Sequence, residues 1–383
     1  MVHPNVARIV QLVVVFVTTT TTTTTTVSAT ATPRIVGGDA VWDATRYPYF
    51  TGLFIDEFGD NTYEYKCGAT LIWHDVILTA AHCVADYLCY GEKKVEGMNI
   101  AAMVNMSKME VPSDTEFIRE TTRFLRHSSY QGFLFLEDDD DLKREVVDQF
   151  DVTDDLVLMQ LDRPVQGVPH LALNFDPDLG QYDDPVTSIG FGDMNVYADD
   201  DQWSTDEVFD RPDRLQEVDL VVMDGEECEE TYENSGVLFS QSKMICAGVW
   251  GGGQSSCYGD SGGPLIIKGD DHSEDIQVGL VSFGIGCGQP GYWGAYTRIS
   301  EYENFIKDSI CTLSAVRPEY CDVRRRERRW LGALEDLTEA PFHCTVVAHP
   351  TISPAPTATP PTPSPGQPQD YKIGDGATAP PSQ

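Results

Sequence analysis

Basic residues are scarce in this chain, and their shortage excludes several classes of protein. Lysine and arginine together number 26 against 61 aspartates and glutamates, which gives a formal net charge of −35 over 383 residues. Nucleic-acid binding depends on basic patches that displace counterions from phosphates, and docking on anionic lipid needs similar patches. We therefore expect no nucleic-acid partner, no membrane partner and, because of self-repulsion, a monomer.

Long hydrophobic runs are also missing. The apolar run at residues 9–17 would span about 14 Å as a helix, less than half of a hydrocarbon core of about 30 Å. Its place near the start predicts a signal peptide over residues 1–29, with cleavage after Ala29 or Ala31. The alternative is a buried strand behind a low-complexity leader of threonines. No C-terminal lipid-anchor signal follows, so we expect a secreted, extracellular protein.

Metal-site spacing is absent as well. The 10 cysteines include no CxxC pair and no His/Cys cluster with zinc spacing, so we expect no structural zinc. Their even number in a secreted chain permits full disulfide pairing. The acidic runs at 137–141 and 199–201 lack the loop pattern of a calcium site and are interpreted as solvated loops, with cation binding as the alternative.

Residues 35 to about 312 are typical of a β-rich domain. A hydrophobic fraction of 41% is enough to bury a core. Short apolar or alternating runs separated by turn residues favour a sandwich or barrel; they lie at 69–73, 75–79, 156–161, 186–190, 215–223, 264–267, 278–283 and 293–299. Only residues 300–310 have helical spacing of apolar side chains, with Ser300 as the expected N-cap.

The C-terminal part of the chain changes character twice. Residues 313–348 form a basic extension that contains cysteines and a cluster of five arginines before Trp330. Residues 349–383 are rich in proline and threonine, and this composition predicts an extended, disordered tail.

A serine between glycines is the first candidate for chemistry. Small residues around Ser261, in Gly259-Asp260-Ser261-Gly262-Gly263, allow a substrate carbonyl to approach the backbone closely. The amides of Gly259 and Ser261 are candidate donors to an oxyanion. A serine hydroxyl is a poor nucleophile without a base, so a second residue is needed.

His82 is the candidate base, and an aspartate at the start of an apolar strand is its candidate partner. Asp154 and Asp155 are adjacent there, and Asp155 directly precedes the run Leu156-Val157-Leu158. A carboxylate that enters a core needs a partner, and a histidine ring nitrogen is a suitable one.

These motifs together resemble the chymotrypsin/trypsin-like serine protease family. The resemblance covers residues 35–312 and rests on motifs in a fixed order: Ile35-Val36-Gly37-Gly38, Cys67-Gly68-Ala69-Thr70-Leu71-Ile72, Thr79-Ala80-Ala81-His82-Cys83, Asp154-Asp155-Leu156-Val157-Leu158, Gly190-Phe191-Gly192, Cys257-Tyr258-Gly259-Asp260-Ser261-Gly262-Gly263-Pro264 and Val281-Ser282-Phe283-Gly284. It implies an all-β fold of two antiparallel β-barrels with a C-terminal helix.

The resemblance also implies a role for each catalytic residue. Ser261 would attack the peptide carbonyl, His82 would carry the proton, and Asp155 would orient the imidazole. Asp155 is preferred over Asp154 because it stands directly before the apolar run. Gly259 and Ser261 would form the oxyanion hole, and Ser282 would support Asp155. No cofactor and no metal are expected.

Activation and specificity are further implications of the resemblance. Residues 30–34 would be a propeptide cut after Arg34, so that the new ammonium of Ile35 pairs with Asp260. The primary pocket would have Ser255 at its base, Ser282 beside it and Gly284 and Gly294 in its walls. A neutral, open pocket favours large apolar or aromatic residues; trypsin-like preference is the alternative. A neutral pocket would cut poorly after Arg34, so an arginine-specific protease would be the activating partner.

Family positions further suggest three disulfides, Cys67–Cys83, Cys228–Cys246 and Cys257–Cys287. Cys89, Cys311, Cys321 and Cys344 remain, with three possible pairings. Asn105 is an N-glycosylation acceptor in Asn-Met-Ser.

The sequence therefore predicts a secreted serine endopeptidase that acts on polypeptides and is open to protein inhibitors. The rival hypothesis is a silent relative that binds or inhibits without catalysis. His82 and Asp155 are 73 positions apart, which is long for the family, so the acidic insert between them is expected to restrict access to the site. A further possibility is that the tail decides where the molecule acts.

Overall fold

The structure is a computed structural model, and it describes residues 35–56, 59–84, 99–110, 117–130, 150–194 and 211–323. The chain divides into two units, residues 1–343 and 344–383, and all described residues belong to the first. The predicted signal peptide, Arg34, the two acidic runs, the arginine cluster and the tail lie outside the described residues. In the part of the chain described, no helix is long and apolar enough to cross a membrane.

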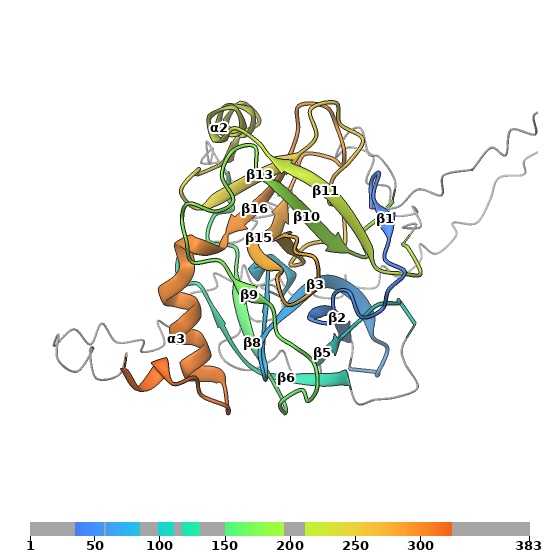
Figure 1. The fold of residues 1–383 in the computed structure, drawn as a ribbon, viewed down its shortest axis with the longest axis vertical. Helices are drawn as coiled ribbons and strands as arrows, with labels where there is room; N and C mark the ends of the chain where they lie inside the picture. Colours follow the sequence, from blue (N-terminus) through green and yellow to red (C-terminus); the bar gives the residue numbers. More distant parts are fainter. Residues whose placement is uncertain are drawn as a thin grey trace, which may run out of the picture. The chain divides into compact units, whose positions relative to one another are not determined.

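The first barrel is closed by strands in the order β2-β3-β4-β8-β6-β5 (Figure 1). These strands are β2 (Phe50–Asp56), β3 (Glu64–Trp73), β4 (Val76–Thr79), β5 (Asn99–Val104), β6 (Ile118–Arg126) and β8 (Val157–Leu161). All four residues of β4 and four of the five in β8 are buried, because both strands carry β-branched and apolar side chains that fill the interior. Their antiparallel pairing sets Thr79 opposite Val157, which brings the end of β4 to the start of β8.

The second barrel is closed by the order β11-β10-β14-β15-β16-β13, since β13 also pairs with β11 (Figure 1). Its strands are β10 (Pro185–Gly190), β11 (Gln216–Val222), β13 (Met244–Gly248), β14 (Pro264–Ile267), β15 (Ile276–Phe283) and β16 (Gly294–Arg298). Short strands β1 (Asp39–Ala40) and β9 (Ala172–Leu173) add to β11 and β15, and β7 (Phe150–Asp151) pairs with β12 (Val237–Leu238). The prediction of two antiparallel barrels is confirmed.

The eight predicted strands all exist, with ends shifted by a few residues, but four longer strands were not foreseen: β2, β5, β6 and β13. Strand β6 contains few apolar residues and several polar ones, such as Glu120 and Arg123. Most of its side chains are partly or fully exposed to solvent, so an apolar pattern is not required there. Strand β2 contains Thr51 and Gly52, which interrupt its apolar run.

Two expectations about helices were wrong. A helix not predicted, α2 (Gly225–Asn234), begins after Asp224, whose carboxylate accepts the N–H groups of Glu226 and Glu227. Only Cys228 and Tyr232 of α2 are buried, so its apolar pattern is too sparse to reveal it.

Ser300 is not an N-cap. The chain leaves β16 into a 3-10 turn, η4 (Ile299–Tyr302), and the α-helix α3 (Glu303–Leu313) follows Tyr302. Ile306 and Ile310 are buried at the predicted spacing, so the C-terminal helix itself is confirmed. Beyond α3, the hydrogen bond from Ala315 N–H to Asp75 (2.8 Å) fixes the chain to the first barrel, and the disulfide between Cys321 and Cys311 ties the following residues back to α3.

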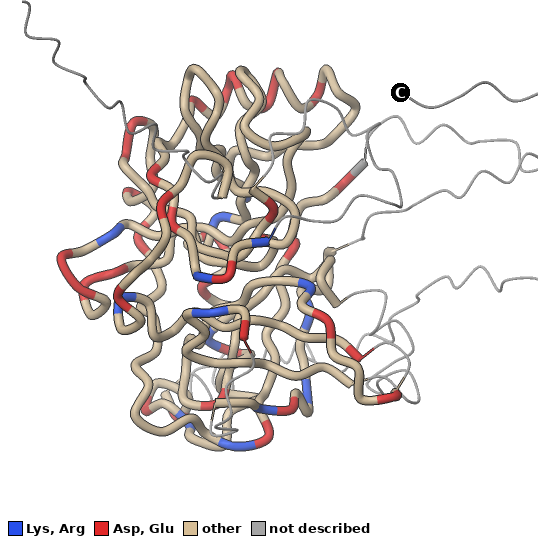
Figure 2. The backbone as a smooth tube through the Cα atoms, turned by 90° about the vertical axis from the view of Figure 1, so that its right-hand side faces the viewer, with Lys and Arg blue, Asp and Glu red and all other residues tan. Residues whose placement is uncertain are grey.

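Acidic residues are distributed along loops of both barrels, with fewer lysines and arginines between them (Figure 2). One basic residue has a structural role between the barrels: Arg46, before β2, donates to both carboxylate oxygens of Asp275, before β15. Tyr49 donates to the same buried carboxylate at 2.6 Å. These bonds help to fix one barrel against the other.

Candidate active site

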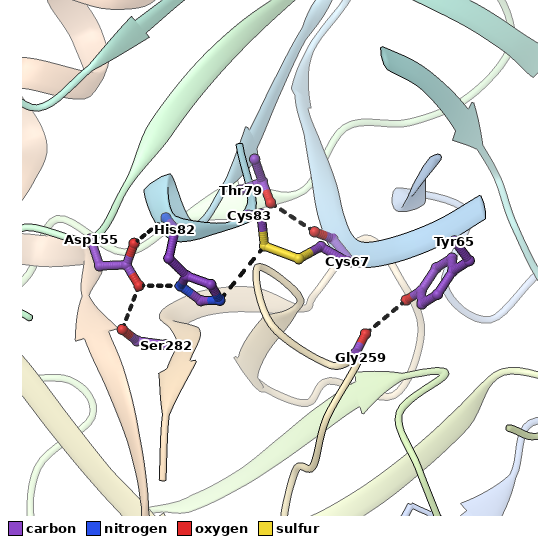
Figure 3. The surroundings of a disulfide bond; sticks show 9 residues. Tyr65, Cys67, Thr79, His82, Cys83, Asp155, Gly259 and Ser282 are labelled. Atoms are coloured by element: carbon purple, nitrogen blue, oxygen red, sulfur yellow. Dashed lines mark hydrogen bonds and ion pairs between the residues drawn. A yellow bond between two sulfur atoms is a disulfide. The ribbon is translucent and has the colours of Figure 1, made fainter. Parts of the chain in front are cut away.

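His82 and Asp155 meet where β4 and β8 lie side by side. His82 is in the 3-10 turn η1 (Ala81–Cys83) just after β4, and Asp155 stands just before β8. Asp155 Oδ2 is 2.7 Å from His82 Nδ1, and Asp155 Oδ1 accepts the His82 backbone N–H at 2.9 Å (Figure 3). One fully buried carboxylate thus fixes both the ring and the turn that carries it.

Ser282, in β15 of the second barrel, adds a third hydrogen bond. Its hydroxyl donates to Asp155 Oδ2 at 2.6 Å (Figure 3), and the Thr297 hydroxyl donates to the Asp155 carbonyl at 3.1 Å. Burial raises the pKa of Asp155, but the charge of the His82 ring and the hydrogen bonds from His82 and Ser282 outweigh burial and hold this pKa below its ordinary value. Asp155 is therefore a carboxylate at neutral pH.

Asp154 has different partners. Its carboxylate is 2.7 Å from Lys243 Nζ and accepts the Tyr302 hydroxyl at 3.1 Å. Of the two candidates that the sequence offered, the structure brings Asp155 to His82 and turns Asp154 to the opposite side of the chain.

The loop that carries Ser261 lies against the first barrel. The Gly68 N–H, in β3, donates to the Ser261 carbonyl at 2.8 Å. Gly262 has a φ of +75°, and a Cβ there would be 2.1 Å from Thr79 Oγ1 and 3.0 Å from the Ala80 nitrogen. This contact requires glycine, and it brings the serine loop to the residues that immediately precede His82.

Gly259 is fixed from the same side. Its φ is +97°, a conformation that favours glycine, and its carbonyl accepts the Tyr65 hydroxyl at 3.0 Å (Figure 3). Tyr65 belongs to β3, two residues before Cys67. This role could not be predicted from the sequence, because a tyrosine within a strand usually belongs to the hydrophobic core.

Asp260 is fully buried inside the serine loop. Its carboxylate accepts the N–H groups of Gly192 (2.7 Å) and Cys257 (2.8 Å). Burial is the largest cause that raises the pKa of Asp260 to about 7, and the charge of Asp193 raises it further. The two backbone N–H donors and the charge of Arg211 lower this pKa but do not outweigh burial. A Cβ on Gly192 would lie 2.2 Å from this carboxylate, so the glycine-aromatic-glycine motif makes room for Asp260.

Of the expected pocket residues, Gly294 lies next to Ser256, which follows Ser255 in the chain. Ser255 is buried and its hydroxyl donates to the Ser256 carbonyl at 2.7 Å, while the Ser256 hydroxyl is 3.0 Å from the Tyr296 hydroxyl. A Cβ on Gly294 would lie 3.1 Å from the Tyr296 hydroxyl, and one on Gly284 would meet only the Gly286 carbonyl at 3.4 Å. Ser256 and Tyr296 were not singled out as site residues from the sequence.

Four disulfides are present among the described residues: Cys67–Cys83, Cys228–Cys246, Cys257–Cys287 and Cys311–Cys321. The first three are the pairs that the family resemblance suggested, and the fourth joins two of the four cysteines whose pairing the sequence left open. Cys89 and Cys344 lie outside the described residues. Cys67, His82 and Cys83 bring possible metal ligands within 4.8 Å, but both cysteines are in the disulfide and offer no thiolate.

Three further residues were expected to have a role. Ile35 is fully buried, whereas Arg34 lies outside the described residues. Asn105 directly follows β5, half-buried and with a φ of +58°, and its glycosylation stays a prediction.

Comparison with known proteins agrees with the geometry. The family model described as trypsin matches residues 35–306. The chain is 30% identical to Trypsin-1 of Astacus astacus over 274 residues, which cover 71% of this chain and 98% of that protein. It is 26% identical to Trypsin II-P29 of Gallus gallus over 252 residues (65% and 82%), and 27% identical to Testisin of Homo sapiens over 305 residues (75% and 82%). The chain therefore belongs to the trypsin family of serine proteases.

Proposed function

We propose that this protein is a secreted serine endopeptidase whose catalytic residues are Ser261, His82 and Asp155. The observation that carries the proposal is the bond between Asp155 Oδ2 and His82 Nδ1 (2.7 Å), together with the serine loop that packs on the residues before His82. A buried, ionised Asp155 keeps a proton on Nδ1, which makes Nε2, 3.8 Å from Cys83 Sγ in this structure, the ring nitrogen that accepts a proton.

The reaction follows from this tautomer. Ser261 Oγ attacks the peptide carbonyl while His82 Nε2 takes its proton, and the imidazolium, stabilised by Asp155, then donates that proton to the leaving amine. Water repeats the sequence on the acyl-enzyme with the same base. The backbone N–H groups of Gly259 and Ser261 are proposed to stabilise the oxyanion, typically worth about 3–4 kcal/mol for each donor.

Activation by cleavage after Arg34 is part of the proposal. Its support is Asp260, whose burial raises its pKa to about 7, so that the ionised carboxylate gains from a nearby cation. The new ammonium of Ile35 would supply that cation, and an arginine-specific protease would be the activator. Asp260→Asn is expected to leave the cleaved chain with greatly reduced activity, whereas the matched variant Asp270→Asn, at an exposed loop, is expected to keep full activity.

The proposed preference is for large apolar or aromatic residues before the cleaved bond. Ser255 and Ser256 supply hydroxyls instead of a carboxylate at the pocket base, and Gly284 and Gly294 leave its walls without side chains. Trypsin-like preference is the alternative, which would need a carboxylate from elsewhere.

The test is to cleave the chain after Arg34 and assay peptides that end in Phe, Leu or Arg, with Ser261→Ala as control. We expect turnover of the Phe and Leu peptides and a loss of at least about 10⁴-fold in the control. Equal turnover in the control would refute the mechanism, and a strong Arg preference would refute only the pocket argument. No turnover after correct cleavage would favour a silent, binding relative.

A further inference from the structure

A second buried carboxylate lies one residue before Asp155. The side chain of Asp154 is 4% exposed, and its backbone φ of +61° is in the left-handed region, which directs it away from His82. It accepts the hydroxyls of Tyr302 (3.1 Å) and Thr153 (3.2 Å). Neutral donors do not cancel its charge, and a buried anion without a counter-charge is strongly unfavourable.

Lys243 supplies a positive charge from the second barrel. Its Nζ is 2.7 Å from Asp154 Oδ2. The residue stands directly before β13, and its backbone carbonyl accepts the Arg298 N–H at 2.8 Å, which fixes the start of the side chain. The side chain is 35% exposed, so its stem extends inward from the surface to the carboxylate.

Among the residues that the structure describes, His127 and Tyr302 also face Asp154, and the Thr153 hydroxyl links Asp154 to the carboxylate of Asp151. His127 Nδ1 is 3.4 Å from Asp154 Oδ1, and its ring packs edge-on against Tyr302 and Phe305. Burial lowers the pKa of His127, Asp154 raises it and Lys243 lowers it, with a net lowering, so the ring is neutral at pH 7. Burial, Asp154 and Glu301 raise the pKa of Tyr302, which stays protonated. Within the described part of the chain, Lys243 is therefore the cation that faces Asp154.

We infer that Lys243 is a positioning residue for the proposed reaction: its ion pair with Asp154 cancels a second buried negative charge, so that His82 responds to one carboxylate and not to two. The inference rests on the proposed roles of His82 and Asp155. Lys243 touches neither the substrate nor the reacting atoms, and it acts only through the field at Asp155.

Opposite charge changes at this ion pair should move the titration of His82 in opposite directions. In Lys243→Gln, the uncompensated Asp154 stabilises the imidazolium, so the titration midpoint of His82 moves to higher pH by about one half to one unit. In Asp154→Asn, the uncompensated ammonium moves it to lower pH. In the double variant Asp154→Asn/Lys243→Gln, both charges are gone and the midpoint returns close to that of the parent.

The measurement is the pH dependence of the His82 Cε1–H resonance by NMR, with Ser261→Ala as the common background. Among the 8 histidines of the chain, this resonance is assigned by its loss in His82→Gln. Because His127 can take up a proton once Lys243 is lost, the series is repeated with His127→Gln, where we expect the larger shift. Thermal unfolding of each variant establishes that it is folded.

Lys268→Gln is the matched control. It also removes a lysine from an ion pair, with Glu217 at 2.8 Å, but on another part of the second barrel. We expect no movement of the His82 midpoint in this variant. The inference is overturned if Lys243→Gln leaves the midpoint in place in both backgrounds, if both single variants move it in the same direction, or if the double variant fails to restore it.

The same series in the active background gives a second measurement, the acid limb of kcat/KM, which should move with the NMR midpoint. If the parent chain cleaves no peptide, the proposed function fails, yet the NMR series still decides the charge argument. If peptides are cleaved and the midpoints do not move, the inference alone fails.

Discussion

Asp155 and Asp154 are consecutive in the chain, but their carboxylates have different partners. Asp155 faces the imidazole of His82 and the hydroxyl of Ser282, and both contacts hold its charge beside the ring that moves a proton in the proposed reaction. Asp154 faces the ammonium of Lys243 and the phenol of Tyr302. The comparison teaches that the partner of a buried carboxylate decides whether its charge is used or cancelled.

Asp155→Asn should produce the largest effect, because an amide no longer fixes the imidazole tautomer. We expect kcat to fall by about 10⁴-fold on a peptide substrate. Asp154→Asn is the matched control and should change kcat at most a few-fold near pH 8. This variant shifts the titration of His82, and that shift affects activity only at acidic pH. Similar losses in the two variants, measured by steady-state kinetics near pH 8, would end the distinction between the two aspartates.

Ser282→Ala tests the second contact of Asp155. The lost hydrogen bond to a charged group should lower kcat/KM by about tenfold or more, and it should raise the pKa of Asp155 because Ser282 stabilises the ionised form. Steady-state kinetics near pH 8 give the loss of activity, and urea unfolding between pH 6 and pH 3 should show the titration of Asp155 at a higher pH than in the parent. Ser273→Ala, which removes an exposed hydroxyl bonded to Asp271, should leave both measurements unchanged.

The stability of the fold should also depend on pH through Asp155. Because its pKa is lowered in the folded protein, ionised Asp155 adds stability above its ordinary pKa of about 3.9, and that stability is lost as pH falls through the folded value. Urea unfolding between pH 6 and pH 3 should show the parent losing about 1 kcal/mol more than Asp155→Asn, which is the most that an unfolded-state pKa of about 3.9 allows by pH 3. Parallel curves for the two proteins would contradict this assignment.

Tyr302→Phe should give the smallest effect. It removes one hydroxyl from Asp154 and should lower the free energy of unfolding by about 1 kcal/mol in urea titrations. The rate on peptide substrates should stay the same, because Lys243 still cancels the charge of Asp154. A large loss of kcat with unchanged stability would mean that the Asp154 region takes a direct part in the reaction.

Much of the fold was predictable, because the apolar runs of strands such as β4 and β8 leave a strong local pattern. Strand β6 and helix α2 were missed because most of their side chains are exposed or half-buried, and both contain too few apolar residues to form a recognisable pattern. Ser300 was misplaced as an N-cap because the 3-10 turn after β16 is set by the packing of Tyr302 and not by a capping side chain.

The candidate site was predictable to the level of residue type. His82, Asp155 and Ser261 lie in short local motifs that follow one another in a fixed order. The same motifs contain glycines, and the structure shows why two of them are needed: a Cβ at Gly192 would clash with Asp260, and one at Gly262 would clash with Thr79. The supporting residues Tyr65, Ser256, Lys243 and Tyr302 were not predictable, since each looks like ordinary core or surface in the sequence.

The sequence by itself determined the family, through its motifs, and the apolar runs that become strands, because motifs and runs depend on neighbouring positions in the chain. Only the tertiary structure decided which of two adjacent aspartates reaches His82, 73 positions away, and which meets Lys243, 89 positions away. The physical reason is that a left-handed backbone at Asp154 and the pairing of β4 with β8 set the direction of each side chain, and neither is encoded in the two residue types.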